Sequence, residues 1–185
     1  MKVLIGCEYS GIVSKAFRDV HHDVISCDFE PSPGNPNHYQ GSVIDLLHLP
    51  FDLAIFFPPC TYLAKCRMWD KSQERLHNRI LAFEFIKELW SCSIPKIAIE
   101  NPVGWLNKNW MPPSQITNPK FFGSPYSKEV CLWLKNLPPL IHTCHSPGLK
   151  KVSNHVNSRM SQAAKSKIKS KFFPEMAKEM ANQWS

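Results

Sequence analysis

The stretch DLAIFFPPC, residues 52–60, decides the fold. Its first half is a short, nearly continuous apolar run, which is typical of a strand buried on both faces of a parallel sheet. Pro58 and Pro59 end this strand, because proline donates no hydrogen bond to a sheet. Cys60 then lies on a loop at the carboxyl end of the strand, where open α/β sheets bind their ligands. Its thiol is either a positioned nucleophile or a small residue of the core.

A second apolar segment, IPKIAIENP at residues 94–102, ends in a carboxylate and an amide. Between the two segments, residues 71–90 have apolar side chains at helical spacing and contain no proline or glycine, which predicts one crossover helix. The expected apolar face of this helix is Leu76, Ile80, Phe83, Ile86 or Lys87, and Trp90. Two strands joined by one helix are parallel and close together. We therefore expect Cys60 and Glu100 to face one crevice.

The rest of the chain fits the same architecture. Residues 2–7 and 23–29 predict two further strands, and residues 12–20 have the period of a helix. A strand, a glycine turn at Gly11 and the start of a helix form a common seat for a nucleotide-like cofactor. Asp28, at the tip of its strand, either binds a ribose or is an ordinary turn acid. Residues 31–39 and 105–120 are predicted loops, so we expect one α/β domain over residues 1–185, with a single mostly parallel sheet flanked by helices.

Composition restricts the environment of the protein. The chain has a hydrophobic fraction of 43% and a formal net charge of +7, with no apolar run long enough to span a membrane and no signal-peptide profile at its start. Its 7 cysteines are odd in number and include no CxxC pair, which indicates reduced thiols in a cytoplasm. Only His142, Cys144 and His145 cluster, and without a second spaced pair they do not predict a metal site.

The segments PPC and ENP, each at the end of a predicted strand, resemble the fourth and sixth motifs of the cytosine-5 methyltransferases. This resemblance implies a Rossmann-like class I methyltransferase fold and S-adenosyl-L-methionine as cofactor. It implies that Cys60 adds to C6 of cytosine while Glu100 protonates or hydrogen-bonds N3. The chain looks most like compact phage and prophage members that lack a target-recognition domain, which implies a phage or prophage setting. The family resemblance implies DNA as the partner, with phosphate contacts from the basic segment near the carboxyl end.

The resemblance also implies roles for residues in the other motifs. CEYSG is similar to the first motif, and Asp28 and Phe29 match the second, with contacts to ribose and adenine. Ser42 stands where the family has an aspartate that meets the adenine amino group, and Asp45 could replace it only if the turn is displaced. The implied cofactor-binding residues are Cys7, Glu8, Tyr9, Ser10, Gly11, Asp28, Phe29, Ser42 and Pro58. In the eighth motif, Lys128 keeps a positive charge near the base, and the implied substrate-binding residues are Pro59, Asn101 and Tyr126.

The carboxyl-terminal part of the chain has two distinct features. Residues 146–172 form a basic, loop-like segment that is either a phosphate contact or a solubilising loop. Its basic residues are Lys150, Lys151, Arg159, Lys165, Lys167, Lys169 and Lys171. Residues 173–184 predict a closing helix that, by resemblance, packs beside the first strand and helps to close the cofactor pocket.

Two alternatives to a DNA methyltransferase remain. The small size and the missing arginines of the eighth motif also fit C5 methylation of free cytosine nucleotides. The reduced glycine motif and Ser42 fit a non-catalytic nucleic-acid-binding or anti-defence protein.

Overall fold

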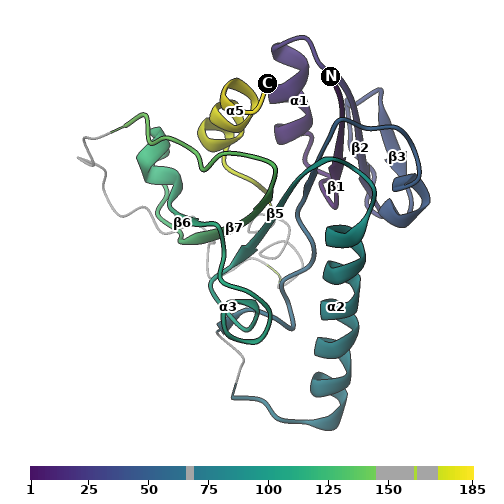
Figure 1. Ribbon diagram of the computed structural model, residues 1–185, viewed down its shortest axis with the longest axis vertical. Helices are drawn as coiled ribbons and strands as arrows, with labels where there is room; N and C mark the ends of the chain where they lie inside the picture. The colour runs from purple at the N-terminus through teal and green to yellow at the C-terminus, as the bar shows by residue number, and fades with distance from the viewer. Residues whose placement is uncertain (66–68, 145–160, 162–170) are drawn as a thin grey trace.

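The computed structural model describes residues 1–65, 69–144, 161 and 171–185. These residues form one sheet of seven strands in the order β3-β2-β1-β4-β5-β7-β6 (Figure 1). In chain order, the strands are β1 Lys2–Gly6, β2 Asp23–Asp28, β3 His38–Gln40, β4 Leu53–Phe56, β5 Lys96–Pro102, β6 Gln115–Thr117 and β7 Val130–Lys135. The predicted single sheet is confirmed.

Strand direction divides the sheet into two parts. Neighbouring strands from β3 to β5 pair in parallel, whereas β7 pairs antiparallel with both β5 and β6. The sheet is therefore mostly parallel, as the sequence predicts. β1 lies between β2 and β4, and the connections that leave β1 and β4 run in opposite directions across the sheet. Open α/β sheets have a crevice at such a switch point, at the carboxyl ends of the strands.

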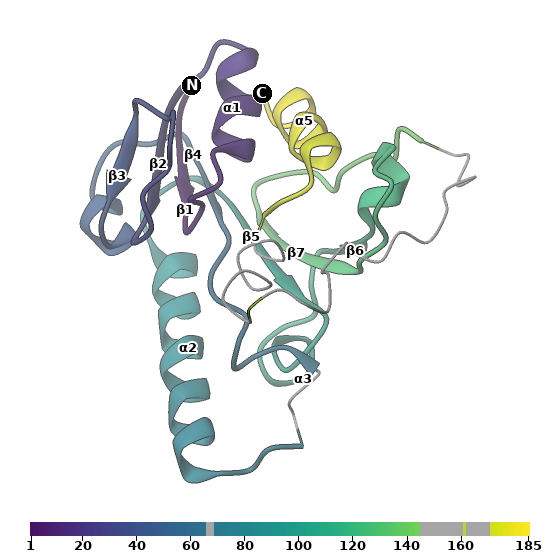
Figure 2. The same cartoon turned by 180° about the vertical axis from the view of Figure 1, so that it is seen from behind.

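The helices cover both faces of the sheet. α1 (Ile12–Asp19) and α5 (Pro174–Gln183) pack against each other on one face, and α2 (Gln73–Ser91) covers the other (Figures 1 and 2). Side chains alternate between the two faces of each strand and so contribute to two hydrophobic cores, one on each face of the sheet. In β4, Leu53 and Ile55 join the core under α1 and α5, whereas Ala54 and Phe56 join the core under α2.

The closing helix is confirmed with bounds close to those predicted. Pro174 occupies its first position, and the helix buries one apolar face against α1. The buried residues of this face are Met176, Ala177, Met180 and Ala181, followed by Trp184. None of the described segments is both long enough and apolar enough to form a membrane-spanning helix.

Three short elements were missed in the segments predicted as loops. The first of these segments contains β3, and the second contains the helix α3 (Leu106–Asn109) and β6, with the 3-10 helix η3 (Pro119–Phe122) across its end. A second 3-10 helix, η1 (Val43–Leu46), follows β3. Each element is only three or four residues long, which is too short for a hydrophobic period to be recognised in the sequence. Its structure depends instead on hydrogen bonds to neighbouring strands or on turn geometry.

The predicted apolar face of α2 is partly wrong. Ile86 is buried as expected, but Ile80 is 59% exposed, and the buried positions about two and three turns before Ile86 are the two arginines Arg79 and Arg75. Their guanidinium groups reach the backbone carbonyls of Tyr62 and Thr61. A buried arginine is stable only when its donors are satisfied in this way, so the helix turns this face inward.

Candidate active site

The ends of β4 and β5 bring together the two residues that the sequence singles out. Phe56 pairs with Ile99 in the parallel register, so Glu100 continues β5 directly beside the point where the chain leaves β4 toward Cys60. Cys60 is partly buried, and its carbonyl accepts hydrogen bonds from the backbone N–H groups of Leu63 and Ala64. The loop after β4 is therefore a tight turn, and both residues lie at one edge of the sheet.

Asn101 joins the two strand ends directly. Its side chain is buried, and Nδ2 donates a 3.0 Å hydrogen bond to the carbonyl oxygen of Pro58. The side-chain amide of Asn101, which the resemblance assigns to substrate binding, thus donates one hydrogen bond to the chain's own Pro58 carbonyl. Oδ1 of Asn101 is buried with no hydrogen-bond partner among the described residues.

Further along the chain, backbone contacts connect the same two loops a second time. Ala64 and Gly104 form an isolated antiparallel bridge, and the N–H of Trp105 donates to the Leu63 carbonyl at 2.8 Å. A Cβ atom at Gly104 would lie 2.2 Å from that carbonyl oxygen, so only glycine permits this approach. The loop that carries Cys60 and the loop that follows Glu100 consequently form one rigid unit.

Glu100 is a buried acid that has the cation Lys128 nearby. Its Oε1 has no hydrogen-bond partner among the described residues, and Lys128 Nζ lies 4.0 Å from it. Burial raises the pKa of Glu100 above its usual value of 4.5, and the charge of Lys128 opposes that shift. A carboxyl group in this setting holds its proton to higher pH than an exposed one and is able to donate it.

Lys128 reaches this site from the segment before β7. Asn118 holds the segment, because its Oδ1 accepts from the N–H groups of Lys120 and Lys128. Tyr126 is partly buried and lies with its ring 6.3 Å from that of Phe173, and the Lys128 ammonium lies 6.0 Å from the same ring. The structure thus places Lys128 beside Glu100, whereas Tyr126 packs toward the closing helix.

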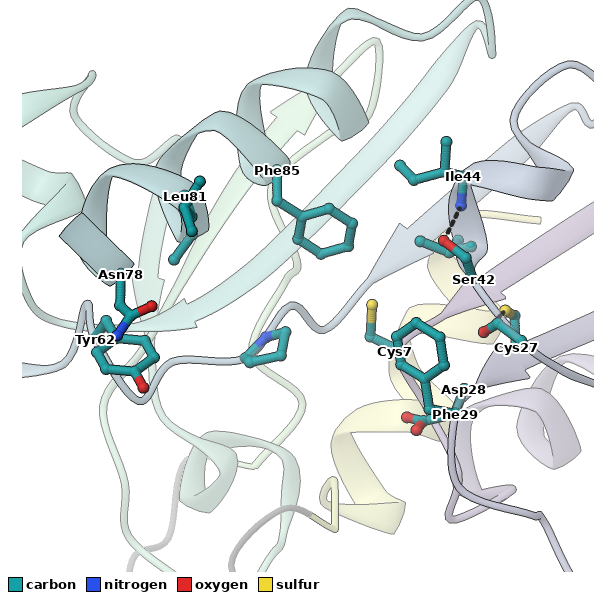
Figure 3. Close-up of a pocket in the computed structure, with 14 residues that line it drawn as sticks. Cys7, Cys27, Asp28, Phe29, Ser42, Ile44, Tyr62, Asn78, Leu81 and Phe85 are labelled. Carbon is teal, nitrogen blue, oxygen red and sulfur yellow. Dashed lines mark hydrogen bonds between the residues drawn. The ribbon is translucent and has the colours of Figure 1, made fainter. Parts of the chain in front are cut away.

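A pocket of about 480 Å³ lies next to this site (Figure 3). One wall comes from the carboxyl ends of β1 and β2 and from the turn before η1, and the facing wall comes from α2. The lining residues are Cys7, Cys27, Asp28, Phe29, Gly41, Ser42, Val43, Ile44, Pro59, Tyr62, Asn78, Leu81, Ala82 and Phe85. The volume is that of a typical small-molecule site.

The pocket contains part of the predicted cofactor set. Cys7, Asp28, Phe29 and Ser42 line it, and the Phe29 ring is 76% exposed, so that its face is available for stacking. Pro59, expected on the substrate side, lines it as well, whereas Pro58 is not among the lining residues. The closing helix contributes no lining residue either.

Glu8, Tyr9, Ser10 and Gly11 are also outside the pocket lining. Glu8 instead anchors the start of α1: its buried carboxylate accepts from the N–H of Ile12 at 2.9 Å and from the Ser10 hydroxyl. Burial raises the pKa of Glu8, and these hydrogen bonds oppose the shift. Gly11, the residue before α1, has a φ of 72°, a left-handed conformation that glycine adopts without steric strain.

Ser42 and Asp45 have separate structural tasks. The Ser42 hydroxyl accepts a 3.3 Å hydrogen bond from the N–H of Ile44 and so caps η1. Asp45 accepts from the Tyr39 hydroxyl at 2.9 Å and does not line the pocket. The turn is therefore not displaced in the way that would put Asp45 in place of Ser42.

Several site residues were not singled out from the sequence. Tyr62, Asn78, Leu81 and Phe85 line the pocket, and the three on α2 do not belong to the apolar face that the sequence predicts for this helix. An apolar residue on the exposed side of α2, such as Leu81 at 53% exposure, is the signal that could have marked this wall.

Some predictions fall wholly or largely outside the described residues. Of the basic segment 146–172, only Ser161 and residues 171–172 are described, and Lys171 is exposed. Phe172 returns to the site, with its ring 4.8 Å from that of Phe57 at the end of β4. His145 also lies outside the described part, and within that part no group of three His, Cys, Asp or Glu side chains is arranged to hold a metal ion.

The sequence matches no protein-family model and no curated protein. Among solved structures, Dnmt2 methyltransferase of S. pombe is similar at a TM-score of 0.52 and 16% identity, over 75% of this chain and 52% of that one. The fold is that of the Rossmann-like methyltransferases.

Two further structures match less well. A mutant of DNMT2 from Spodoptera frugiperda has a TM-score of 0.47 and 16% identity, over 75% of this chain and 52% of that one. A candidate DNA modification methyltransferase encoded within an E. coli prophage has a TM-score of 0.48 and 15% identity, over 72% of this chain and 46% of that one. The chain thus corresponds to about half the length of these proteins.

The Asn101 clamp gives a first prediction. Replacing Asn101 with leucine removes the donor to the Pro58 carbonyl and leaves that buried carbonyl unpaired, so the free energy of unfolding should fall by about 1–3 kcal/mol. Urea denaturation measures this change. Asn109→Leu removes an exposed amide and should change stability by less than about 0.5 kcal/mol. Equal unfolding curves for Asn101→Leu and wild type would contradict the clamp.

The buried acid gives a second prediction. Because the pKa of Glu100 is raised in the folded state, its stabilising contribution is fully present below pH about 4.5 and is lost as pH rises through the raised pKa. Glu100→Gln should therefore become more stable than wild type across that window, by about 1.4 kcal/mol for each unit of the shift. Unfolding at pH 4 to 8 measures the difference. Glu129→Gln, at an exposed acid, is the control, and a difference between Glu100→Gln and wild type that does not change with pH would refute the assignment.

Proposed function

We propose that this protein is an S-adenosyl-L-methionine-dependent methyltransferase that acts on C5 of cytosine in DNA through a covalent Cys60 adduct. The observation that carries the proposal is the joined edge of β4 and β5. There, one buried hydrogen bond from Asn101 to Pro58 holds the loop of a cysteine beside a buried acid. The fold and the adjoining pocket supply the setting that this chemistry needs.

Cys60 and Glu100 would act together on the cytosine ring, Cys60 at C6 and Glu100 at N3. The Cys60 thiolate would form a bond to C6, and the electrons of the C5–C6 double bond would shift into the C4–C5 bond while the C4–N3 pair moves onto N3, which takes a proton or a hydrogen bond from Glu100. C5 is then the nucleophilic carbon of an enamine. Burial suits Glu100 for this role, because it raises the pKa of the carboxyl group, which therefore holds its proton to higher pH than an exposed acid does. Lys128, 4.0 Å from Glu100, would hold positive charge near the base.

The pocket residues fit an adenosine-bearing cofactor. Asp28 ends β2 with its carboxylate in the lining, where it is able to accept from ribose hydroxyls, and the exposed Phe29 ring beside it offers a stacking surface for adenine. When bound there, S-adenosyl-L-methionine would supply the methyl group that C5 takes up. The donor sulfonium would leave as the thioether S-adenosyl-L-homocysteine. Loss of the C5 proton to water or another base, with return of the N3 proton to Glu100, would then restore the C5–C6 double bond and expel the Cys60 thiolate.

One contact favours a polymer over a free nucleotide. Lys171 ends the basic stretch of the sequence, and the next residue, Phe172, packs against Phe57 directly after β4. The described end of the basic stretch is therefore anchored at the same edge as Cys60, where its charge suits a phosphate backbone. A cytosine in a duplex would have to be flipped out to meet Cys60 and Glu100.

Transfer of labelled methyl from S-adenosyl-L-methionine tests the proposal. The panel contains duplex DNA, single-stranded DNA, RNA and free cytidine and deoxycytidine nucleotides. We expect label in DNA, and Cys60→Ser should lower the rate at least about a thousandfold, because it removes the nucleophile. Cys92→Ser, at a partly buried cysteine of the α2 end, is the matched control and should keep the wild-type rate.

The other outcomes separate the alternatives. Label only in nucleotides would replace DNA by a small substrate at the same residues. No label in any substrate, together with no binding of the cofactor by calorimetry, would leave a non-catalytic nucleic-acid-binding protein and refute the proposal.

A further inference from the structure

Two buried arginines hold the backbone directly after Cys60. Arg75 and Arg79 lie one turn apart on α2, at 5% and 6% exposure. Arg75 Nη2 donates to the Thr61 carbonyl at 2.7 Å, and Arg79 Nε donates to the Tyr62 carbonyl at 3.0 Å. Two arginines on successive turns of the helix thus bind two consecutive carbonyls of the loop.

Burying these two guanidinium groups costs free energy of folding. Burying a guanidinium group removes its water, and Arg79 Nη2 remains without a hydrogen-bond partner among the described residues. An apolar pair at these positions would pack α2 against the loop without that cost. The two positive charges therefore need an explanation beyond packing.

Their position suggests one. The Arg75 guanidinium group binds the carbonyl of the residue next to Cys60 and also lies 5.3 Å from the centre of the Tyr62 ring. A positive charge near a cysteine favours the thiolate, and the field is strong where water is excluded. An ordinary cysteine is only a few per cent ionised near neutral pH, so a nucleophilic Cys60 would need such a field.

We propose that Arg75 and Arg79 are positioning residues for Cys60, which orient its loop through the Thr61 and Tyr62 carbonyls and supply the positive field that favours its thiolate. The assignment rests on the proposed nucleophilic role of Cys60. Tyr62 also lines the pocket, so the same two hydrogen bonds connect the nucleophile loop to the wall of the candidate cofactor site.

The test separates charge from packing by comparing glutamine with lysine. Arg79→Gln keeps a donor for the Tyr62 carbonyl but loses the charge, whereas Arg79→Lys keeps the charge. The rate of Cys60 alkylation by iodoacetamide is followed against pH by mass spectrometry of the Cys60 peptide, which requires neither cofactor nor nucleic acid. We expect the midpoint of the profile to rise by about one pH unit in Arg79→Gln and to stay near wild type in Arg79→Lys. The same pair of substitutions at Arg75 should behave alike.

Kinetics give the second readout. Near pH 7, Arg79→Gln should lower kcat about tenfold, with KM for the cofactor changed less than about threefold, and Arg79→Lys should recover most of kcat. Lys87→Met removes an exposed charge from the same helix and should leave both values unchanged.

Two results would overturn the inference. The first is an alkylation profile that both Arg79 variants leave at the wild-type midpoint. The second is an equal loss for glutamine and lysine that follows a loss of melting temperature, since this would make the arginines structural only. Failure of methyl transfer by wild type, with the alkylation shift present, would refute the proposed function and leave this inference standing.

Discussion

The parallel pairing of β4 with β5 is the constraint on which the site depends. It fixes the carboxyl ends of both strands at one edge of the sheet, so the loop of Cys60 and Glu100 lie next to each other there. The Asn101 hydrogen bond to Pro58 and the Ala64 and Gly104 bridge then turn two neighbouring loops into one unit. Because α2 connects these strands, the same crossover also supplies one wall of the pocket.

Burial of charge is the second organising feature. Around this edge the protein buries an acid, Glu100, and two cations, Arg75 and Arg79, which bind backbone carbonyls of the loop after Cys60. The acid is held toward its neutral form by desolvation, and the guanidinium groups are held by backbone carbonyls. Such an arrangement costs stability, and in the proposed mechanism it would keep a proton donor apart from a site that favours an anion.

Long-range pairing could be predicted from the sequence because it follows from simple rules. Two buried strands and one crossover helix have essentially one topology, and this placed Cys60 beside Glu100. The face of α2 could not be predicted in the same way. Arginine is read as a surface residue, and only the carbonyls of Thr61 and Tyr62, which the fold brings within reach, make its burial favourable. β3 and β6 are too short for a period, and their formation depends on their neighbours in the sheet.

The cofactor side was predicted in part for a related reason. Asp28 and Phe29 end a strand, and strand ends can be located from sequence, so both fall in the pocket. Glu8 and Ser42 have oxygens that bind the chain's own N–H groups of Ile12 and Ile44, and these local hydrogen bonds compete with any role toward a ligand.

The measurement that tests the central claim most directly is the intact mass of the protein after incubation with S-adenosyl-L-methionine and a DNA oligonucleotide whose cytosines carry fluorine at C5. Fluorine cannot leave C5 as a proton does, so the proposed adduct would be trapped. We predict a stable complex that has the mass of protein plus methylated oligonucleotide, with the bond on the Cys60 peptide, and no complex for Cys60→Ser. Label transfer without a trapped complex, or a complex on another cysteine, would contradict the account.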